Sequence, residues 1–135
     1  YRETTESFSN LIIVVEKRMT SIYWIIIREK KIEFYYMALQ RHKSLNIHPG
    51  IILKEEVIIP EGLTIGEAAE HLNTTRLTLS KIVNGKSGIT PNMALRIQYV
   101  FGGTAELWLR MQRKYDLIEA EDFFEVKGLK KIAHH

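Results

Sequence analysis

LTIGEAAEHLNTTRLTLSKIVNG, residues 63–85, is the stretch of sequence that decides the fold. Near its start, Thr64 is followed three residues later by Glu67, which is the spacing of a capping box at a helix N-terminus. Small and apolar residues then recur at helical spacing on one face: Ala68, Ala69 and Leu72. The first half of the stretch therefore predicts a short amphipathic helix.

The second half of the same stretch predicts a turn and another short helix. Asn73 and Thr74 make the turn, because asparagine tolerates a positive φ. Thr75 caps the next helix, which ends at Asn84 and Gly85, since glycine suits the left-handed conformation at a helix C-terminus. The residues expected to face the core are Leu79 and Ile82.

Helical signals continue on both sides of this stretch. Upstream, Pro49 suits the first turn of a helix that Pro60 ends. Downstream, Thr90-Pro91 begins a helix that Gly102-Gly103 stops, and Thr104 caps a last one. The residues expected to face the core of these helices are Ile51, Ile52, Val57, Ile58, Met93, Ala94, Leu95, Ile97, Val100, Leu107, Trp108, Met111 and Tyr115. We therefore expect an all-α domain.

Composition excludes several classes of function. The 135 residues are 45% hydrophobic and 26% charged, as in an ordinary globular protein. The chain has no cysteine, which excludes disulfides, thiolate zinc sites and a cysteine nucleophile. Apart from the terminal pair His134-His135, its histidines show no metal-ligand spacing, and it has no phosphate-binding loop, so we expect no metal, no cofactor and no enzymatic activity. No apolar run approaches the ~20 residues of a membrane span, so we expect a cytoplasmic protein without a membrane partner.

Basic residues are segregated along the chain. The net charge is only +3, but residues 71–105 contain no Asp or Glu, whereas both flanks are acidic. The basic residues of this stretch are Arg76, Lys81, Lys86 and Arg96. Such a stretch can present one positive face to a phosphate backbone. A solvated surface with unordered charges is the alternative that charge alone leaves open.

Two short helices joined by a tight turn can place the second helix in the major groove of DNA. The outward face of that helix carries Arg76, Leu77, Ser80 and Lys81. Arginine can donate two hydrogen bonds to a guanine, whereas leucine can only contact a thymine methyl group. The pattern therefore indicates a protein that binds double-stranded DNA.

Residues 63–85 resemble the helix-turn-helix of the XRE and phage-repressor family along their whole length. The flanking motifs are similar to those of the HigA/VapI antitoxins over about residues 46–117: HPG (48–50), LKEE (53–56), IVNGK (82–86), ALR (94–96), ELWL (106–109) and YDL (115–117). The sequence departs from the pattern at Ile65, which stands where a polar residue, often Gln, begins the first helix of the motif. Asn73-Thr74 replaces the usual Gly and apolar residue of the turn, and Ile51 replaces a common Glu.

The resemblance implies a five-helix repressor-like domain that binds as a homodimer to a palindromic operator upstream of its own operon. It also implies the antitoxin of a HigB-type toxin, an mRNA endoribonuclease neutralised by binding. By position it implies base contacts from Arg76, Leu77, Ser80 and Lys81, and phosphate contacts from Thr75, Asn84 and Lys86. Two alternatives remain: a stand-alone XRE-family regulator without a toxin, and a protein-binding helical module without DNA affinity.

We expect the chain to divide into three segments: an N-terminal extension (1–44), the helix-turn-helix domain (45–118) and a charged C-terminal tail (119–135). β-branched and aromatic residues in the first segment lean towards strand, although no turn signal joins two strands. Because Met19 and Met37 are candidate natural starts, we hypothesise that much of 1–36 is an upstream extension. The alternative is an amphipathic arm that packs on a partner. The acidic stretch 119–125 is most simply a solvated face, and its more specific interpretation is a docking site for a basic toxin.

Overall fold

The fold is that of a computed structural model, which describes residues 21–41 and 46–133. Within these ranges every regular element is helical, so the predicted all-α class is confirmed. The elements are α2 (Ser21–Arg41), α3 (Pro49–Leu53), the π-helix η1 (Lys54–Ile58), α4 (Ile65–His71), α5 (Arg76–Val83), α6 (Pro91–Phe101) and α7 (Ala105–Asp122). In the described part of the chain, no helix combines the length and the apolar character needed to cross a membrane.

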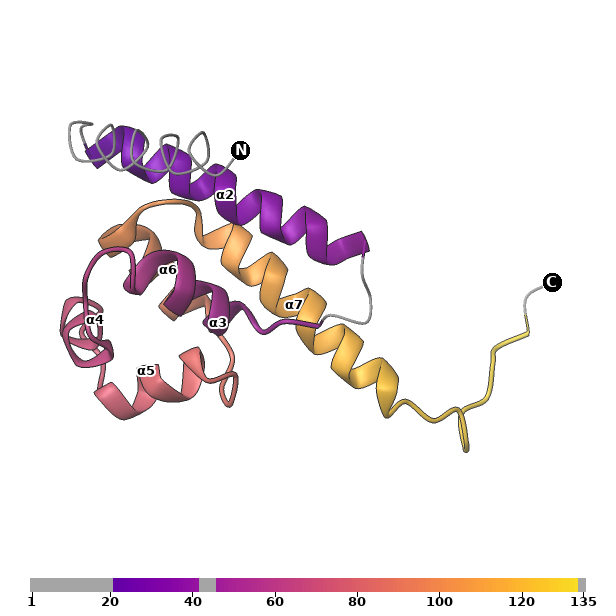
Figure 1. Ribbon diagram of the computed structural model, residues 1–135. Helices are drawn as coiled ribbons and strands as arrows, with labels where there is room; N and C mark the ends of the chain where they lie inside the picture. Colours follow the sequence, from indigo (N-terminus) through magenta and orange to yellow (C-terminus); the bar gives the residue numbers. More distant parts are fainter. Residues whose placement is uncertain (1–20, 42–45, 134–135) are drawn as a thin grey trace, which may run out of the picture.

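The short helices α3, α4, α5 and α6 form one end of the molecule, and the long α7 extends away from them (Figure 1). Their apolar faces meet in one core, in which Leu53, Leu72, Leu79 and Ile97 are almost fully buried. Burial of such side chains contributes roughly 1.5–3 kcal/mol each. This core fixes the positions of α4 and α5, the two helices of the expected DNA-binding unit.

Most of the predicted core residues are buried, Val100 and Tyr115 are half-buried, and two are exposed. Leu95 is 57% exposed and Ile51 is 41% exposed. The buried face of α6 is made by Met93, Ala94, Ile97 and Phe101. Successive helical residues are about 100° apart, so a side chain next to this stripe turns away from it. The prediction that Leu95 faces the core was therefore wrong.

The predicted helix caps are confirmed at three of four threonines. Thr64, Thr75 and Thr90 each accept a hydrogen bond from the backbone N–H three residues on, at 3.1, 3.1 and 3.2 Å. Thr104 stands at the N-cap of α7 but makes no side-chain cap hydrogen bond. Instead, the side-chain oxygen of Gln98 accepts from the Ala105 N–H at 2.8 Å. A residue of the preceding helix α6 thus caps α7.

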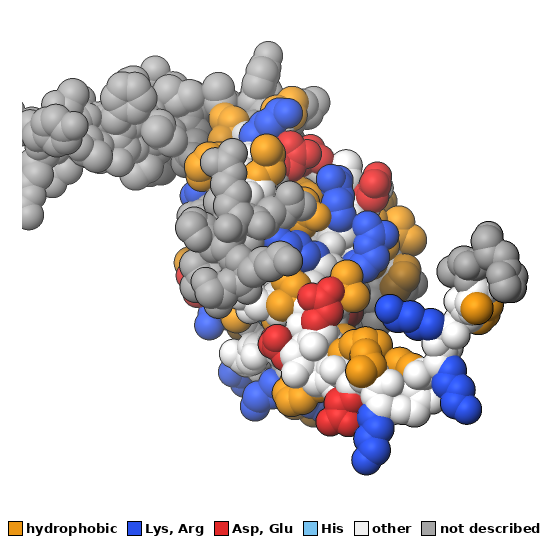
Figure 2. All heavy atoms as spheres, turned by 90° about the vertical axis from the view of Figure 1, so that its right-hand side faces the viewer, with side chains coloured by type: hydrophobic (Ala, Val, Ile, Leu, Met, Phe, Trp, Pro, Cys, Tyr) orange, Lys and Arg blue, Asp and Glu red, His pale blue; other side chains and the backbone are white. Residues whose placement is uncertain are grey.

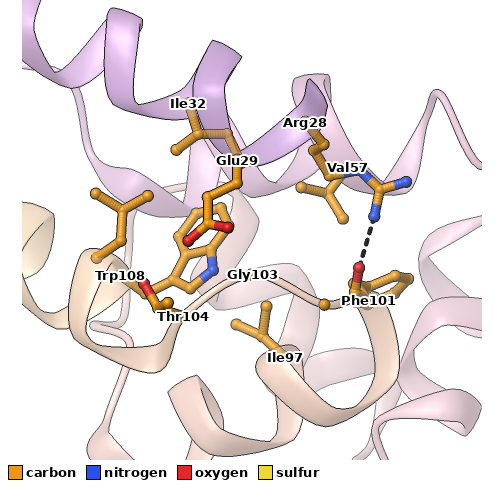
Figure 3. A pocket seen from close by; sticks show the side chains of 11 residues that line it. Arg28, Glu29, Ile32, Val57, Ile97, Phe101, Gly103, Thr104 and Trp108 are labelled. Atoms are coloured by element: carbon orange, nitrogen blue, oxygen red, sulfur yellow. Dashed lines mark hydrogen bonds between the residues drawn. The ribbon is translucent and has the colours of Figure 1, made fainter. Parts of the chain in front are cut away.

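The segment that leaned towards strand contains a helix instead. Residues 21–41 form α2, which lies alongside α7 (Figure 1). Figure 3 shows Arg28 and Ile32 pointing from α2 towards the end of α6 and Trp108. Ile32 is buried, and the Arg28 guanidinium donates to the Phe101 carbonyl at 2.8 Å and pairs with Glu61. Tertiary packing thus overrides β-propensity here, as it often does.

The proposed boundaries of the three segments stay predictions. Residues 1–20, and with them most of the hypothesised upstream extension, lie outside the described residues. Residues 21–36 are the described part of this segment, and they pack on the helical domain through Arg28 and Ile32 of α2. At the other end, α7 continues to Asp122, and residues 123–133 follow it as an exposed segment without helix.

Candidate nucleic-acid interface

The turn between α4 and α5 is a Schellman motif with asparagine in the left-handed position. Asn73 has a φ of 50°, as its tolerance for this region predicts. The N–H of Thr74 donates to the Ala69 carbonyl at 2.9 Å, and the N–H of Asn73 donates to the Glu70 carbonyl at 3.1 Å. These two bonds are the pair that defines the motif. They end α4 sharply and direct the chain into α5.

Both ends of α5 are fixed by hydrogen bonds. At its start, Thr75 caps the helix, and its hydroxyl also lies 2.7 Å from the Thr78 hydroxyl. At its end a second Schellman motif forms, with Gly85 at a φ of 73° and the Lys86 N–H donating to the Lys81 carbonyl at 2.8 Å. The helix is therefore presented as a rigid element rather than a frayed one.

The residues proposed to read bases lie on the outer side of α5. Arg76, Leu77 and Lys81 are exposed, Leu77 by 66%. Ser80 is half-buried. The inner side of the helix consists of Leu79, Ile82 and Val83, all buried. The structure thus brings the four predicted base-contact residues to one helix, with three of them open to solvent.

The residues proposed to contact phosphates flank this face. Thr75 and Lys86 are exposed at the start of α5 and just beyond its end. Asn84 is exposed too, but its side-chain amide donates to the Ser80 carbonyl at 2.8 Å and approaches the Ser80 hydroxyl at 3.3 Å. Asn84 and Ser80 are thus partly occupied with each other, whereas Lys86 extends from the loop.

The loop that carries Lys86 is held by Gln112, a buried residue of α7. Its side-chain oxygen accepts from the Ile89 N–H at 2.9 Å, and its amide donates to Asp116 at 2.9 Å. A Cβ atom added at Gly88 would lie 3.3 Å from the Gln112 amide. Sequence reasoning missed Gln112, because the only local signal was its helical spacing on the α7 face that also carries the core residue Trp108.

His48, the first residue of the HPG motif, joins α3 to α5 and α7. Its Nδ1 accepts from the Gly50 N–H at 2.9 Å and so caps α3. The ring packs edge-on against Tyr115, with centroids 4.8 Å apart, and lies against Gly85. Burial lowers the pKa of His48, and the Asp116 carboxylate opposes this shift. A neutral imidazole is therefore favoured, as the cap requires.

One of the basic residues of 71–105 is turned towards the protein. Arg96, on α6, donates from Nη1 to the carbonyls of Leu72 and Asn73 at 3.1 and 2.8 Å. It therefore contacts the turn of the α4–α5 unit directly. The positive surface expected from this stretch rests on the other three residues, Arg76, Lys81 and Lys86, all of which are exposed.

The side of the molecule that carries the C-terminal end of α7 has a different character. Acidic, basic and hydrophobic side chains are mixed there, and lysines project from the tail (Figure 2). Trp108 is 2% exposed and belongs to the core, which excludes it as a stacking platform for bases. Segregation of basic side chains from acidic ones is thus a property of the α5 region rather than of this side.

Comparison with known proteins agrees with this geometry. A helix-turn-helix family model matches residues 53–108. Virulence-associated protein I of Dichelobacter nodosus is 45% identical over 75 residues, which cover 56% of this chain and 69% of the relative. The antitoxin GraA superposes with a TM-score of 0.59 at 30% identity, over 64% of this chain and 96% of GraA. The Pseudomonas aeruginosa antitoxin HigA, solved with the higBA promoter, gives a TM-score of 0.57 at 30% identity, over 58% of this chain and 86% of that antitoxin. The chain therefore belongs to the XRE-type helix-turn-helix family of DNA-binding regulators and antitoxins, in the group that includes HigA and VapI.

Proposed function

We propose that this protein is a sequence-specific repressor that binds the operator of its own operon and neutralises a cognate toxin. The observation that carries the DNA-binding part is the outer face of α5, which exposes Arg76, Leu77 and Lys81 on a helix capped by Thr75 and ended by a Schellman motif. Likeness to an antitoxin solved with promoter DNA supports the same reading.

In this proposal α5 enters the major groove and its side chains read base edges. Arg76 donates two hydrogen bonds to a guanine, which is worth ~1–3 kcal/mol of discrimination against other bases. Leu77 contacts a thymine methyl group, for which its exposed side chain is available. Lys81 and Ser80 complete the face, with Ser80 the more recessed of the two.

Phosphate contacts set the position of α5 on the duplex. Lys86 is the strongest candidate, because its ammonium group extends from a loop anchored by Gln112. Thr75 and Asn84 stand at the two ends of α5, where their contacts with phosphates would compete with the hydrogen bonds they make inside the helix. We therefore expect Lys86 to contribute most of the salt dependence among the three.

The protein acts in this proposal as a homodimer in the cytoplasm, with no cofactor and no catalytic activity. Two copies of α5 enter successive major grooves about 34 Å apart on a palindromic operator. The partner toxin is of the HigB kind, and this part is supported by relatives named as antitoxins, including Antitoxin HigA-1 of Vibrio cholerae at 29% identity.

A salt-titrated gel shift with the DNA upstream of this gene tests operator binding, with scrambled DNA of the same composition as control. We expect a specific shift whose affinity falls steeply as salt rises, because bound phosphates release counterions. Absence of a shift at low salt, with folded protein, would favour the protein-binding module instead.

Co-expression with the product of the neighbouring reading frame tests the toxin. We expect a small basic protein that arrests growth alone and co-purifies with this chain when both are present. A neighbourhood without such a gene would favour the stand-alone regulator. The proposed docking at the acidic stretch is tested with Glu121→Lys and Glu125→Lys together, since both residues are exposed. Unchanged co-purification would remove that stretch from the interface.

A further inference from the structure

We infer that Arg96 is a positioning residue for DNA recognition: it fixes the direction of α5 by binding the turn between α4 and α5, without contacting DNA. This inference rests on the proposed function and adds a residue outside α4 and α5 to its mechanism. The observation is the pair of hydrogen bonds from one guanidinium nitrogen to two successive carbonyls of the turn, at 3.1 Å to Leu72 and 2.8 Å to Asn73.

The two carbonyls are among those at the end of α4 that have no intrahelical partner. The Schellman motif uses the Ala69 and Glu70 carbonyls. The carbonyls of the C-cap residue Leu72 and of Asn73 come after the last helical hydrogen bond of α4. An arginine side chain carries five N–H donors in a planar fork and suits adjacent acceptors. Arg96 thus provides hydrogen-bond donors to two carbonyls of the turn.

Arg96 links the turn to a rigid part of the molecule. It lies on α6 between Ala94 and Ile97, both of which are fully buried in the core. The turn, by contrast, is exposed at Asn73 and relies on a residue other than glycine at positive φ. Asparagine enters this region less readily than glycine does. The contact from α6 therefore adds support to the turn at its left-handed residue.

The direction of α5 is sensitive to this peptide, because the helix begins two residues later at its cap, Thr75. α5 has 8 residues and is therefore about 12 Å long. A tilt of about 5° at the turn would move its far end by about 1 Å, which exceeds the range of a good N–H···O distance. Base reading needs this precision, whereas attraction to the phosphate backbone does not.

The same geometry separates Arg96 from the phosphate-binding cations. Its guanidinium is half-buried and already donates to two carbonyls, whereas Lys86 is exposed. Loss of a phosphate contact weakens binding to every sequence and lowers the salt slope by about one. Loss of a positioning contact weakens binding to the operator alone and leaves the slope unchanged.

The test compares wild type, Arg96→Ala, Arg96→Lys and Arg113→Ala on operator and scrambled DNA across a salt series. Arg113, exposed on α7, controls for the loss of one positive charge. For Arg96→Ala we expect operator affinity to fall about tenfold or more, with scrambled-DNA affinity and salt slope as in wild type. Arg96→Lys should recover part of the discrimination, because an ammonium group can reach one of the two carbonyls.

Amide hydrogen exchange provides a readout that does not depend on DNA. In Arg96→Ala the N–H groups of Asn73 and Thr74 should exchange about tenfold faster, while amides in the core part of α7 keep wild-type rates. Unchanged exchange at the turn would overturn the inference even if the protein binds its operator. If exchange at the turn accelerates in Arg96→Ala but the wild-type protein binds operator and scrambled DNA equally well, the proposed function is overturned instead.

Two outcomes of the binding series would also overturn the inference. Equal losses on both DNAs with a lower salt slope would make Arg96 a phosphate contact. Equal losses with an unchanged slope would mean that Arg96→Ala only reduces the folded fraction. If Arg96→Ala does not fold, Arg96→Lys decides the matter: full wild-type discrimination together with wild-type exchange at the turn would leave no role for the paired hydrogen bonds.

Discussion

A Cβ atom at Gly50 would lie 1.8 Å from the carbonyl oxygen of Ile82. The first turn of α3 thus packs directly on the backbone of the last turn of α5. No side chain fits between the two helices at this point. Because Ile82 belongs to the proposed recognition helix, the closeness of this contact helps to set where α5 lies relative to the core.

Gly50→Ala should therefore be strongly destabilising. The methyl group can be accommodated only if α3 and α5 move apart, and such overpacking costs ~1–3 kcal/mol or more. Gly66→Ala is the matched control, because its Cβ would meet no atom closer than 3.9 Å. It should be neutral or stabilising by up to about 1 kcal/mol. Urea unfolding measures both, and equal stability of the two variants would contradict the close packing.

The threonine caps give a second comparison. Thr64→Ala removes the hydroxyl that accepts from the Glu67 N–H and should cost ~1 kcal/mol, although the bond from the Thr64 N–H to the Glu67 carboxylate can remain. Thr104→Ala removes a threonine at the N-cap of α7 that makes no such bond, and should change stability by less than about 0.5 kcal/mol. Thermal unfolding followed by circular dichroism distinguishes them. If Thr104→Ala destabilised the protein more than Thr64→Ala, the cap hydrogen bonds would not account for the change in stability.

Gln112 should be important for stability through the loop it holds. Gln112→Leu leaves the Ile89 N–H without its acceptor, and a buried unsatisfied donor costs ~1–3 kcal/mol. Asp116→Asn is the control, since its oxygen can still accept from the Gln112 amide. Denaturant unfolding should show a small effect for Asp116→Asn. Surface substitutions usually change the free energy of unfolding by no more than about 0.5 kcal/mol. A change of only that size in Gln112→Leu would contradict the role of Gln112 in anchoring the loop.

His48 should make stability depend on pH. Burial lowers the pKa of His48 from its ordinary value of 6.5, so the unfolded chain binds the proton more readily than the folded one. The free energy of unfolding should be highest above pH 6.5 and fall as the pH drops below this value. Protonation also removes the Nδ1 acceptor that caps α3.

His48→Asn tests this directly, because asparagine can cap a helix but does not titrate in this range. Stability is measured by urea unfolding at several pH values from 8 to 5 for both proteins. The variant should be less stable above pH 6.5, since it loses the packing on Tyr115, but its stability should depend less on pH. Identical pH dependence in the two proteins would assign the effect to other groups.

The parts of the fold that could be predicted from the sequence are those encoded by neighbouring residues. The capping box at Thr64, the left-handed Asn73 and the C-terminal glycine at Gly85 each follow from a few adjacent side chains. The outward face of α5 was predicted for the same reason, because its period is visible in eight residues. Short-range chemistry therefore locates the candidate site.

The parts that could not be predicted depend on contacts between distant segments. Arg96 and Gln112 act on residues 23 or 24 positions away, and no local pattern marks either one. Leu95 is predicted to face the core as one of a run of apolar residues, Met93 to Leu95, but it points away from its two buried neighbours. The helix over residues 21–41 was missed because its β-branched residues favour strand until Ile32 and Arg28 find partners on the domain.

The central claim, that α5 reads operator bases in the major groove, is tested most directly by methylation footprinting. Dimethyl sulfate modifies guanine at N7 in the major groove and adenine at N3 in the minor groove. We expect protection of guanine N7 in two half-sites about 10 base pairs apart, and loss of one protected guanine per half-site in Arg76→Ala. Protection confined to adenine N3, or a footprint identical in Arg76→Ala, would contradict the claim.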